Sequence, residues 1–266
     1  MKYTVLSLFP ELIDAFFNLS ILGKAVERGI VEYCPVNIRD FAFDRHKTCD
    51  DAPYGGGAGM LMLAEPLGRA LESVGARNRF EVGDGAEKVR VIYLTPSGRP
   101  FTQDLAQELS QERELVLICG RYEGIDQRII DAYVDDELSI GDYVLSSGET
   151  AALVLIDATY RLVDEVITPA SLREESFGGG LLEYPQYTRP EIYGNVGLKV
   201  PEILLSGHHE NIRRWRLMKR VEKTLAMRPE LIARGESAGL FDEETRSLIA
   251  ELQQHKGAKD ERDKGD

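Results

Sequence analysis

Short β-type runs alternate with helical patterns through the first 160 residues, and this alternation constrains the fold more than any other feature. The strand runs are rich in Val, Ile and Leu and lie at residues 2–9, 89–94 and 114–119. The helical patterns repeat apolar residues at three- and four-residue spacing and cover residues 11–28, 102–110, 124–133 and 148–162. Strand, helix, strand order is typical of an α/β domain around a parallel sheet whose two faces are both buried.

The alternation ends near residue 163, so the sequence predicts a division of the chain. Residues 163–180 contain one Pro, three consecutive Gly and no sustained periodicity, which indicates a mobile linker between domains. Residues 181–251 have helical patterns and little strand signal, which predicts a small helical domain. Residues 252–266 are mostly polar and of mixed charge, and we expect a disordered tail there. The α/β domain then covers residues 1–162.

Charge is distributed unevenly along the chain. The net charge is −13, which by itself argues against a nucleic-acid partner, yet residues 206–234 hold eight Lys or Arg and three Glu, a local net charge of +5. Arg213, Arg216 and Arg220 recur at helical spacing around Trp215, the sole tryptophan. This pattern predicts a basic helix face that binds phosphates, against the alternative of a solvated helix with Trp215 in a core.

Three glycine-containing segments, at residues 93–98, 119–124 and 139–149, follow or overlap predicted strands. Ligands of open parallel sheets bind outside the carboxyl ends of the strands, so converging turns predict a site for a purine or an amino-acid moiety. The alternative is that these glycines only end strands. A fourth glycine cluster, in DDAPYGGGAGM at residues 50–60, can approach another backbone or a flat ring closely, or can be a surface turn.

The sequence lacks the signature motifs of several other classes of protein. The sequence contains no GxxxxGK[ST] phosphate loop, no GxGxxG after the first strand and no HExxH, and it has no zinc-spaced Cys/His set. Its three cysteines are widely spaced, which indicates reduced thiols. The longest apolar run covers only residues 151–156, so we expect no membrane span, and we expect a cytoplasmic protein.

Six motifs, in one order over about residues 1–250, closely resemble the bacterial tRNA (guanine-N1)-methyltransferase family. They are SLFPE (7–11), DRHKTCDDAPYGGGAGML (44–61), CGRYEGIDQR (119–128), SIGDYVLSSGE (139–149), GLLEYPQYTRPE (180–191) and LLSGHHENIRRWR (204–216). The resemblance implies a SPOUT-type parallel sheet with a deep trefoil knot, against the general rule that chains are not knotted, plus a C-terminal helical domain that binds tRNA. It also implies a homodimer, S-adenosylmethionine as methyl donor, guanosine 37 as acceptor in a tRNA with G at positions 36 and 37, and Mg²⁺ as a second candidate cofactor.

The resemblance also assigns roles to residues of this chain. The residues implied to bind S-adenosylmethionine are Tyr93, Leu94, Thr95, Pro96, Ser97, Gly120, Arg121, Tyr122, Glu123, Gly124, Ile140, Gly141, Asp142, Tyr143, Val144, Leu145, Ser147 and Gly148. The implied catalytic residues are Arg161, which stabilises charge on the guanine, and Glu175, the general base. No metal ligands are assigned.

Three positions depart from the family pattern. Glu175 of REESF stands where the family has an aspartate before S-F, Glu183 replaces the aspartate of GLLD, and Ser147 stands where glycine is common. The neighbouring Glu174 is an alternative base. Three other functions stay open: methylation of a ribose 2′-OH or another base, RNA binding without catalysis, and nucleotide binding without an RNA partner.

Overall fold

The computed structural model describes residues 1–80, 89–168, 175–195 and 197–262, and side chains as far as residue 254. The chain forms two compact units, Met1–Ile167 and Thr168–Asp266, and each is described by itself.

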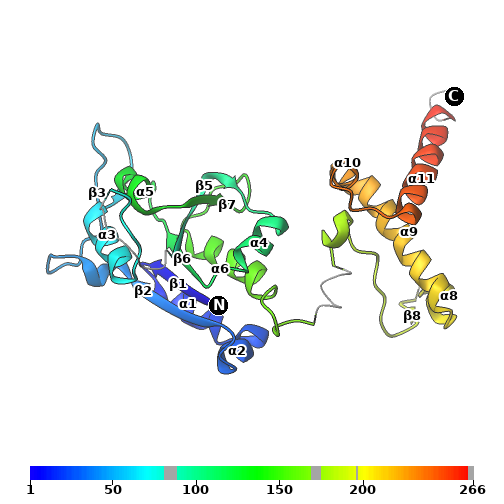
Figure 1. The fold of residues 1–266 in the computed structure, drawn as a ribbon, viewed down its shortest axis with the longest axis horizontal. Helices are drawn as coiled ribbons and strands as arrows, with labels where there is room; N and C mark the ends of the chain where they lie inside the picture. The colour runs from blue at the N-terminus through cyan, green and yellow to red at the C-terminus, as the bar shows by residue number, and fades with distance from the viewer. Residues whose placement is uncertain (81–88, 169–174, 196, 263–266) are drawn as a thin grey trace. The chain divides into compact units, whose positions relative to one another are not determined.

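The N-terminal unit is built on a five-stranded sheet in which every strand pairing is parallel (Figure 1). Its strand order is β2-β1-β6-β5-β7, with β1 (Lys2–Ser7), β2 (Glu32–Asn37), β5 (Arg90–Pro100), β6 (Glu114–Cys119) and β7 (Asp136–Ser139). The α/β class with a parallel sheet, predicted from the alternation, is confirmed.

Side chains of the central strands alternate between two buried layers. Along β6, Leu115, Leu117 and Cys119 belong to one hydrophobic cluster, and Val116 and Ile118 belong to the other. All five are fully buried. This explains why the strand is a continuous apolar run instead of an apolar-polar alternation.

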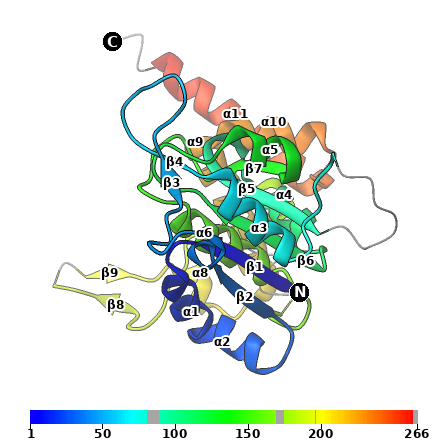
Figure 2. The same cartoon turned by 90° about the vertical axis from the view of Figure 1, so that its left-hand side faces the viewer.

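Helices cover both faces of the sheet. One face packs against α1 (Pro10–Phe17), α2 (Ser20–Glu27), α4 (Gln103–Leu109) and α6 (Glu149–Tyr160). The other packs against the 3-10 helix η1 (Ile38–Phe41), α3 (Ala64–Ser73) and α5 (Gln127–Tyr133). Figure 2 shows α1 and α2 together beside the edge strand β2. The unit is therefore a three-layer α/β/α sandwich.

Local signals account for most element boundaries. The side chain of Thr102 accepts a hydrogen bond from the N–H of Leu105 and begins α4, as its N-cap position predicts. The helix predicted over 11–28 is two helices, because α1 ends at Asn18, whose amide donates back to the carbonyl of Asp14. Strand β2 escaped prediction because Pro35 interrupts its apolar pattern, and a proline is tolerated there because β2 is an edge strand.

The C-terminal unit is helical apart from one small hairpin. Its core joins Leu181, Val221, Ile232, Phe241 and Ile249. Its elements are η2 (Gly178–Gly180), β8 (Ile192–Tyr193), β9 (Leu198–Lys199), α8 (Glu202–Leu205), α9 (His209–Met227), α10 (Pro229–Ser237) and α11 (Glu243–Arg262).

Helix α11 differs from the tail expected over residues 252–266, because it continues through Arg262. Residues 252–262 include two Gln, two Lys, one Arg, one Glu and one Ala, which have high helix propensity and need no tertiary partner to extend a helix already begun. No helix in the described residues is both long enough and apolar enough to cross a membrane.

We expect Leu117→Ala to lower the free energy of unfolding by about 2–5 kcal/mol, because it opens a cavity in the centre of the sheet. Urea denaturation followed by far-UV circular dichroism measures the change. The matched control is Leu19→Ala, since Leu19 is 62% exposed in the same unit, and its effect should stay within about 0.5 kcal/mol. Equal effects of the two substitutions would contradict the assignment of this layer as the core.

Candidate functional site

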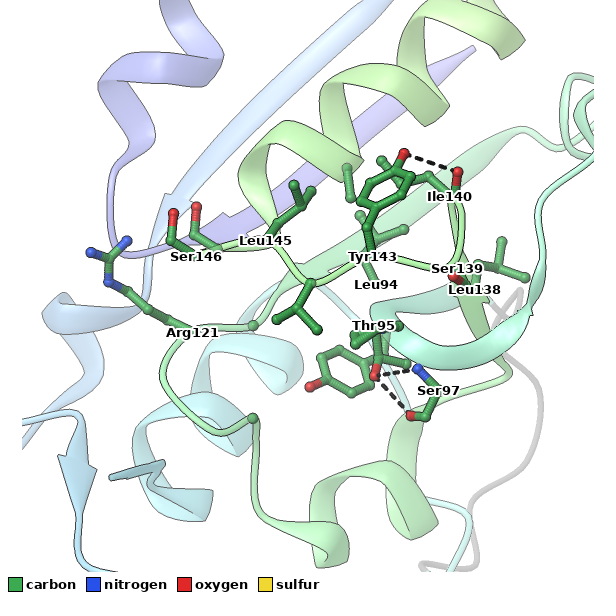
Figure 3. A pocket seen from close by; sticks show the side chains of 18 of the residues that line it. Leu94, Thr95, Ser97, Arg121, Leu138, Ser139, Ile140, Tyr143, Leu145 and Ser146 are labelled. Atoms are coloured by element: carbon green, nitrogen blue, oxygen red, sulfur yellow. Dashed lines mark hydrogen bonds between the residues drawn. The ribbon is translucent and has the colours of Figure 1, made fainter. Parts of the chain in front are cut away.

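A cavity of about 320 Å³ lies at the carboxyl ends of β6 and β7 and beside the middle of β5, where the pairing of β5 with β7 shifts register between Leu94 and Arg99 (Figure 3). Its walls are the segment that follows Leu94, the turn that follows Cys119 and the loop between β7 and α6. Because parallel strands present their carboxyl ends at one edge, three segments far apart in sequence meet there.

The structure brings together the residues to which the sequence assigned donor binding. All of them line this cavity except Asp142, which is exposed on the same loop. The prediction missed four lining residues: Leu138, Ser139, Ser146 and Ala151. The first two are the last residues of β7, and Ala151 lies in the first turn of α6, so the strand end and the helix start were the available signals.

Two of the walls are joined by direct backbone contact. The N–H of Gly148 donates to the carbonyl of Gly120 at 2.8 Å, and Arg121 forms an antiparallel bridge with Ser147. A Cβ at position 148 would lie 2.8 Å from the Cα of Cys119. Only glycine permits this approach without displacement of one segment, so Gly148 fixes the loop before α6 against the end of β6.

Hydrogen bonds within single walls also shape the cavity. Dashed lines in Figure 3 mark those between Thr95 and Ser97 and between Tyr143 and Ile140. The hydroxyls of Thr95 and Ser97 are 2.9 Å apart, and the hydroxyl of Tyr143 donates to the carbonyl of Ile140 at 3.1 Å. Beside them Val144 is 84% exposed. The first residues of the loop between β7 and α6 are therefore held by a hydrogen bond, and the apolar side chain of Val144 that follows them is exposed to solvent.

The glycine-rich segment packs beside the cavity. Strands β3 (Asp50–Asp51) and β4 (Leu61–Met62) form a hairpin around it, and Met62 exchanges backbone hydrogen bonds with Gly124 and Asp126. A Cβ on Gly59 would meet the carboxylate of Glu123 at 2.5 Å. The close approach is to the Glu123 side chain, which lines the cavity, and the glycines themselves are exposed, as in a surface turn.

A buried carboxylate lies immediately behind the cavity. Glu149 is 1% exposed, its Oε1 accepts a 2.6 Å hydrogen bond from Ser7, and its Oε2 has no partner among the described residues. Its place in the first turn of α6 lets the positive end of the helix stabilise the negative charge. Burial, with a contribution from Glu149, raises the pKa of the Cys119 thiol, which favours its neutral form.

The two implied catalytic residues belong to different units. Arg161 ends α6 in the N-terminal unit, whereas Glu175 belongs to the C-terminal unit. The alternative base Glu174 lies outside the described residues.

Glu175 lies at the start of a turn that backbone hydrogen bonds hold together. Its carbonyl accepts from the N–H of Gly178 at 3.1 Å, and the N–H of Phe177 donates to Leu181 at 2.9 Å. The guanidinium of Arg220 donates to the carbonyls of Gly178 and Leu182, at 2.6 and 3.2 Å. Helix α9 therefore anchors the segment that follows Glu175.

The three arginines predicted to form a basic face on α9 contact other residues of the C-terminal unit in the structure. Arg213 forms ion pairs with Glu210 and Glu244, the Arg216 guanidinium lies 4.7 Å above the Tyr184 ring, and Arg220 binds the carbonyls described above. All three arginines thus have partners within their own unit, and the binding of phosphates by this helix face stays a prediction. Charge spacing on a helix does not reveal which cations the tertiary structure uses internally.

Two α9 cations, Arg214 and Lys223, are exposed and have no ion-pair partner among the described residues. At about 100° per residue they lie on opposite sides of the helix. Lys223 shares its side with Arg216, seven residues earlier. The structure also shows no group of three or more His, Cys, Asp or Glu placed to hold a metal ion within its described part.

We expect Gly148→Ala to lower the free energy of unfolding by about 1–3 kcal/mol, because the added methyl would separate the two cavity walls. Thermal and urea denaturation measure it. Gly68→Ala is the matched control: in α3 its Cβ would meet only Ile129 Cδ1, at 3.4 Å, and alanine favours the helix. A neutral Gly148→Ala would show that the close approach is not required.

Comparison with known proteins supplies an independent result. Residues 1–234 match the family model described as tRNA (Guanine-1)-methyltransferase TrmD. The chain is 60% identical over 253 residues to the tRNA (guanine-N(1)-)-methyltransferase of Treponema denticola, across 95% of this chain and 99% of that protein. It is 56% identical over 252 residues to the protein of that name from Treponema pallidum, across 95% of this chain and 96% of that protein.

A relative from a second genus agrees. The tRNA (guanine-N(1)-)-methyltransferase of Borreliella burgdorferi is 60% identical over 233 residues, across 87% of this chain and 92% of that protein. Together with a family model that spans most of the sequence, these matches agree with the resemblance of the six motifs. The chain therefore belongs to the tRNA (guanine-1)-methyltransferase family.

Proposed function

We propose that this protein transfers a methyl group from S-adenosylmethionine to N1 of guanosine 37 in tRNA. The observation that carries the proposal is the convergence of three segments, assigned to donor binding from the sequence, on one cavity at the carboxyl ends of the strands. Family membership supplies the reaction class.

The residues around the cavity suit S-adenosylmethionine. Its volume of about 320 Å³ is within the range of small-ligand sites, and its walls mix apolar side chains with backbone N–H and C=O groups. Leu138, Ile140 and Leu145 offer apolar contact to an adenine ring, while the loop backbones offer its polar edge hydrogen bonds. We also propose that the contacts between the loops at Gly120 and Gly148 belong to a SPOUT-type trefoil knot.

When bound, S-adenosylmethionine supplies the methyl group from its sulfonium centre. The chain must supply the rest of the chemistry, because guanine N1 carries a proton and is a poor nucleophile. A carboxylate within hydrogen-bond reach accepts that proton, with a typical benefit of about 10²–10⁴. Negative charge then develops on O6, where the paired donors of an arginine stabilise it. We assign the first role to Glu175 and the second to Arg161.

The turn that follows Glu175 supports its assignment. Because Arg220 and backbone hydrogen bonds hold Gly178, Leu181 and Leu182, the segment after Glu175 has a defined course. Glutamate has the charge of the family's aspartate and one more methylene, so it reaches farther from the same backbone position. Mg²⁺ stays an expectation from the resemblance.

An exposed apolar surface supports a homodimer. Phe9, Leu12 and Val154 are 41%, 44% and 44% exposed, and the helices α1 and α6 that carry the last two are packed together. Adjacent exposed apolar side chains on two helices are typical of a surface that another chain covers. We propose that a second copy does so, and that the enzyme acts in the cytoplasm.

We expect Glu175→Gln to lower kcat by about 10²–10⁴ with unchanged donor binding, because the amide cannot accept the N1 proton. The assay is transfer of labelled methyl from S-adenosylmethionine to tRNA carrying G36 and G37. Glu175→Asp should retain activity, and activity should rise with pH as guanine N1 loses its proton.

The controls separate the alternatives. A tRNA with G37 replaced should accept no label, and nucleoside analysis should identify N1-methylguanosine; a 2′-O-methyl product would refute the proposed reaction. Glu174→Gln should be mild. Loss of turnover in Glu174→Gln together with full turnover in Glu175→Gln would move the base by one residue.

We expect Lys223→Ala to weaken tRNA binding and to reduce the slope of log Kd against log salt by about 1, because one phosphate contact is lost. Arg214→Ala removes a cation from the opposite side of α9 and should change neither quantity. Filter binding at several salt concentrations measures both. Equal losses of tRNA affinity in Lys223→Ala and Arg214→Ala would show that α9 contributes only its overall positive charge to tRNA binding, without a specific phosphate contact.

A further inference from the structure

The C-terminal unit contains a second cavity, to which neither the motifs nor the family comparison assigned a role. Its volume is about 540 Å³, and it lies among the segment 184–191, α8 and the first half of α9. Tyr184, Tyr187 and Trp215 supply its aromatic rings.

Tyr187 and Trp215 line the cavity as a tilted pair in which Tyr187 is the more exposed ring. The centroids of Tyr187 and Trp215 are 6.5 Å apart, with ring planes tilted by 52°. Tyr187 is 49% exposed and the neighbouring Leu205 is 53% exposed. Core aromatics bury their faces, so the exposed ring of Tyr187 beside a cavity of this size points to a flat ligand that stacks on it.

The charges around the cavity favour an anion. Arg189 and Arg216 line it, and Glu191 is the one carboxylate among the lining residues that the structure describes. The Arg216 guanidinium lies 4.7 Å above the Tyr184 ring. This contact keeps the positive charge of Arg216 in the wall of the cavity. Arg189 is exposed, and Lys223 lies two turns beyond Arg216 on the same side of α9.

We propose that this cavity binds one unstacked nucleobase of the tRNA, stacked on Tyr187 beside Trp215, with an adjacent phosphate at Arg189. The inference rests on the proposed function, because it adds a second point of contact with the same substrate. Stacking on an aromatic face tolerates any base, so the cavity contributes affinity and positioning and leaves the choice of base to the catalytic site.

Trp215 makes the test direct, because it is the only tryptophan of the chain. Unmodified tRNA should quench its fluorescence in the full-length protein. Tyr187→Ala should raise the Kd for tRNA about tenfold at constant salt slope, since stacking involves no counterion release. Arg189→Ala should instead lower the slope by about 1.

Two further variants keep the result interpretable. Tyr187→Phe retains the ring and should bind as the parent does; a loss equal to that of Tyr187→Ala would assign the contact to the hydroxyl and overturn the stacking proposal. Tyr193→Ala, which removes a 68% exposed tyrosine from the β8 hairpin outside the cavity, should leave Kd unchanged.

The outcomes separate this inference from the proposed function. Normal tRNA affinity in Tyr187→Ala, with methyl transfer intact in the parent, would overturn the inference and leave the function standing. Weakened tRNA binding in Tyr187→Ala, with no methyl transfer by the parent, would support the cavity and refute the function. A lower light-scattering mass in Tyr187→Ala at unchanged tRNA affinity would assign the cavity to a second copy and overturn the inference.

Discussion

The contact between Gly148 and the end of β6 is the constraint on which the candidate site depends. Its 2.8 Å hydrogen bond to Gly120 joins the loop before α6 to the turn after β6, and a side chain at position 148 would meet the Cα of Cys119. Three walls can enclose one cavity only because two of them touch at the backbone. The buried Glu149, which bonds Ser7, fixes the start of α6 behind the same contact.

The N-terminal unit can hold these loops because its sheet is buried on both faces. Leu117 and its neighbours belong to one apolar layer, and Val116 and Ile118 belong to the other, so no strand can shift by one residue without moving its side chains to the wrong layer. A fixed strand register fixes the positions at which β5, β6 and β7 end. The cavity is therefore placed by the core, and its chemistry comes from loops that contribute little to that core.

The C-terminal unit uses charge in two ways that the sequence does not distinguish. Arg213 and Arg220 bind partners in their own unit, and Arg220 holds the turn after Glu175. Lys223 is exposed on the side of α9 that carries Arg216, and Arg216 lines the second cavity. A stretch with a net charge of +5 inside an acidic chain thus contains structural cations as well as candidates for contact with RNA.

The sequence by itself determined the α/β class, the boundaries of β6, the N-cap of α4 and, through its motifs, the family and nearly all the residues that line the first cavity. These follow from local patterns: apolar runs, capping side chains and contiguous motifs. Only the tertiary structure decided that Asp142 does not line the first cavity, that Ser139 and Ala151 do, which arginines have partners within their own unit, and that Tyr187 and Trp215 line a second cavity. The reason is that each of these features depends on contacts between segments that are distant in the chain. Loop geometry and competition among charged partners determine those contacts, so no local sequence pattern predicts them.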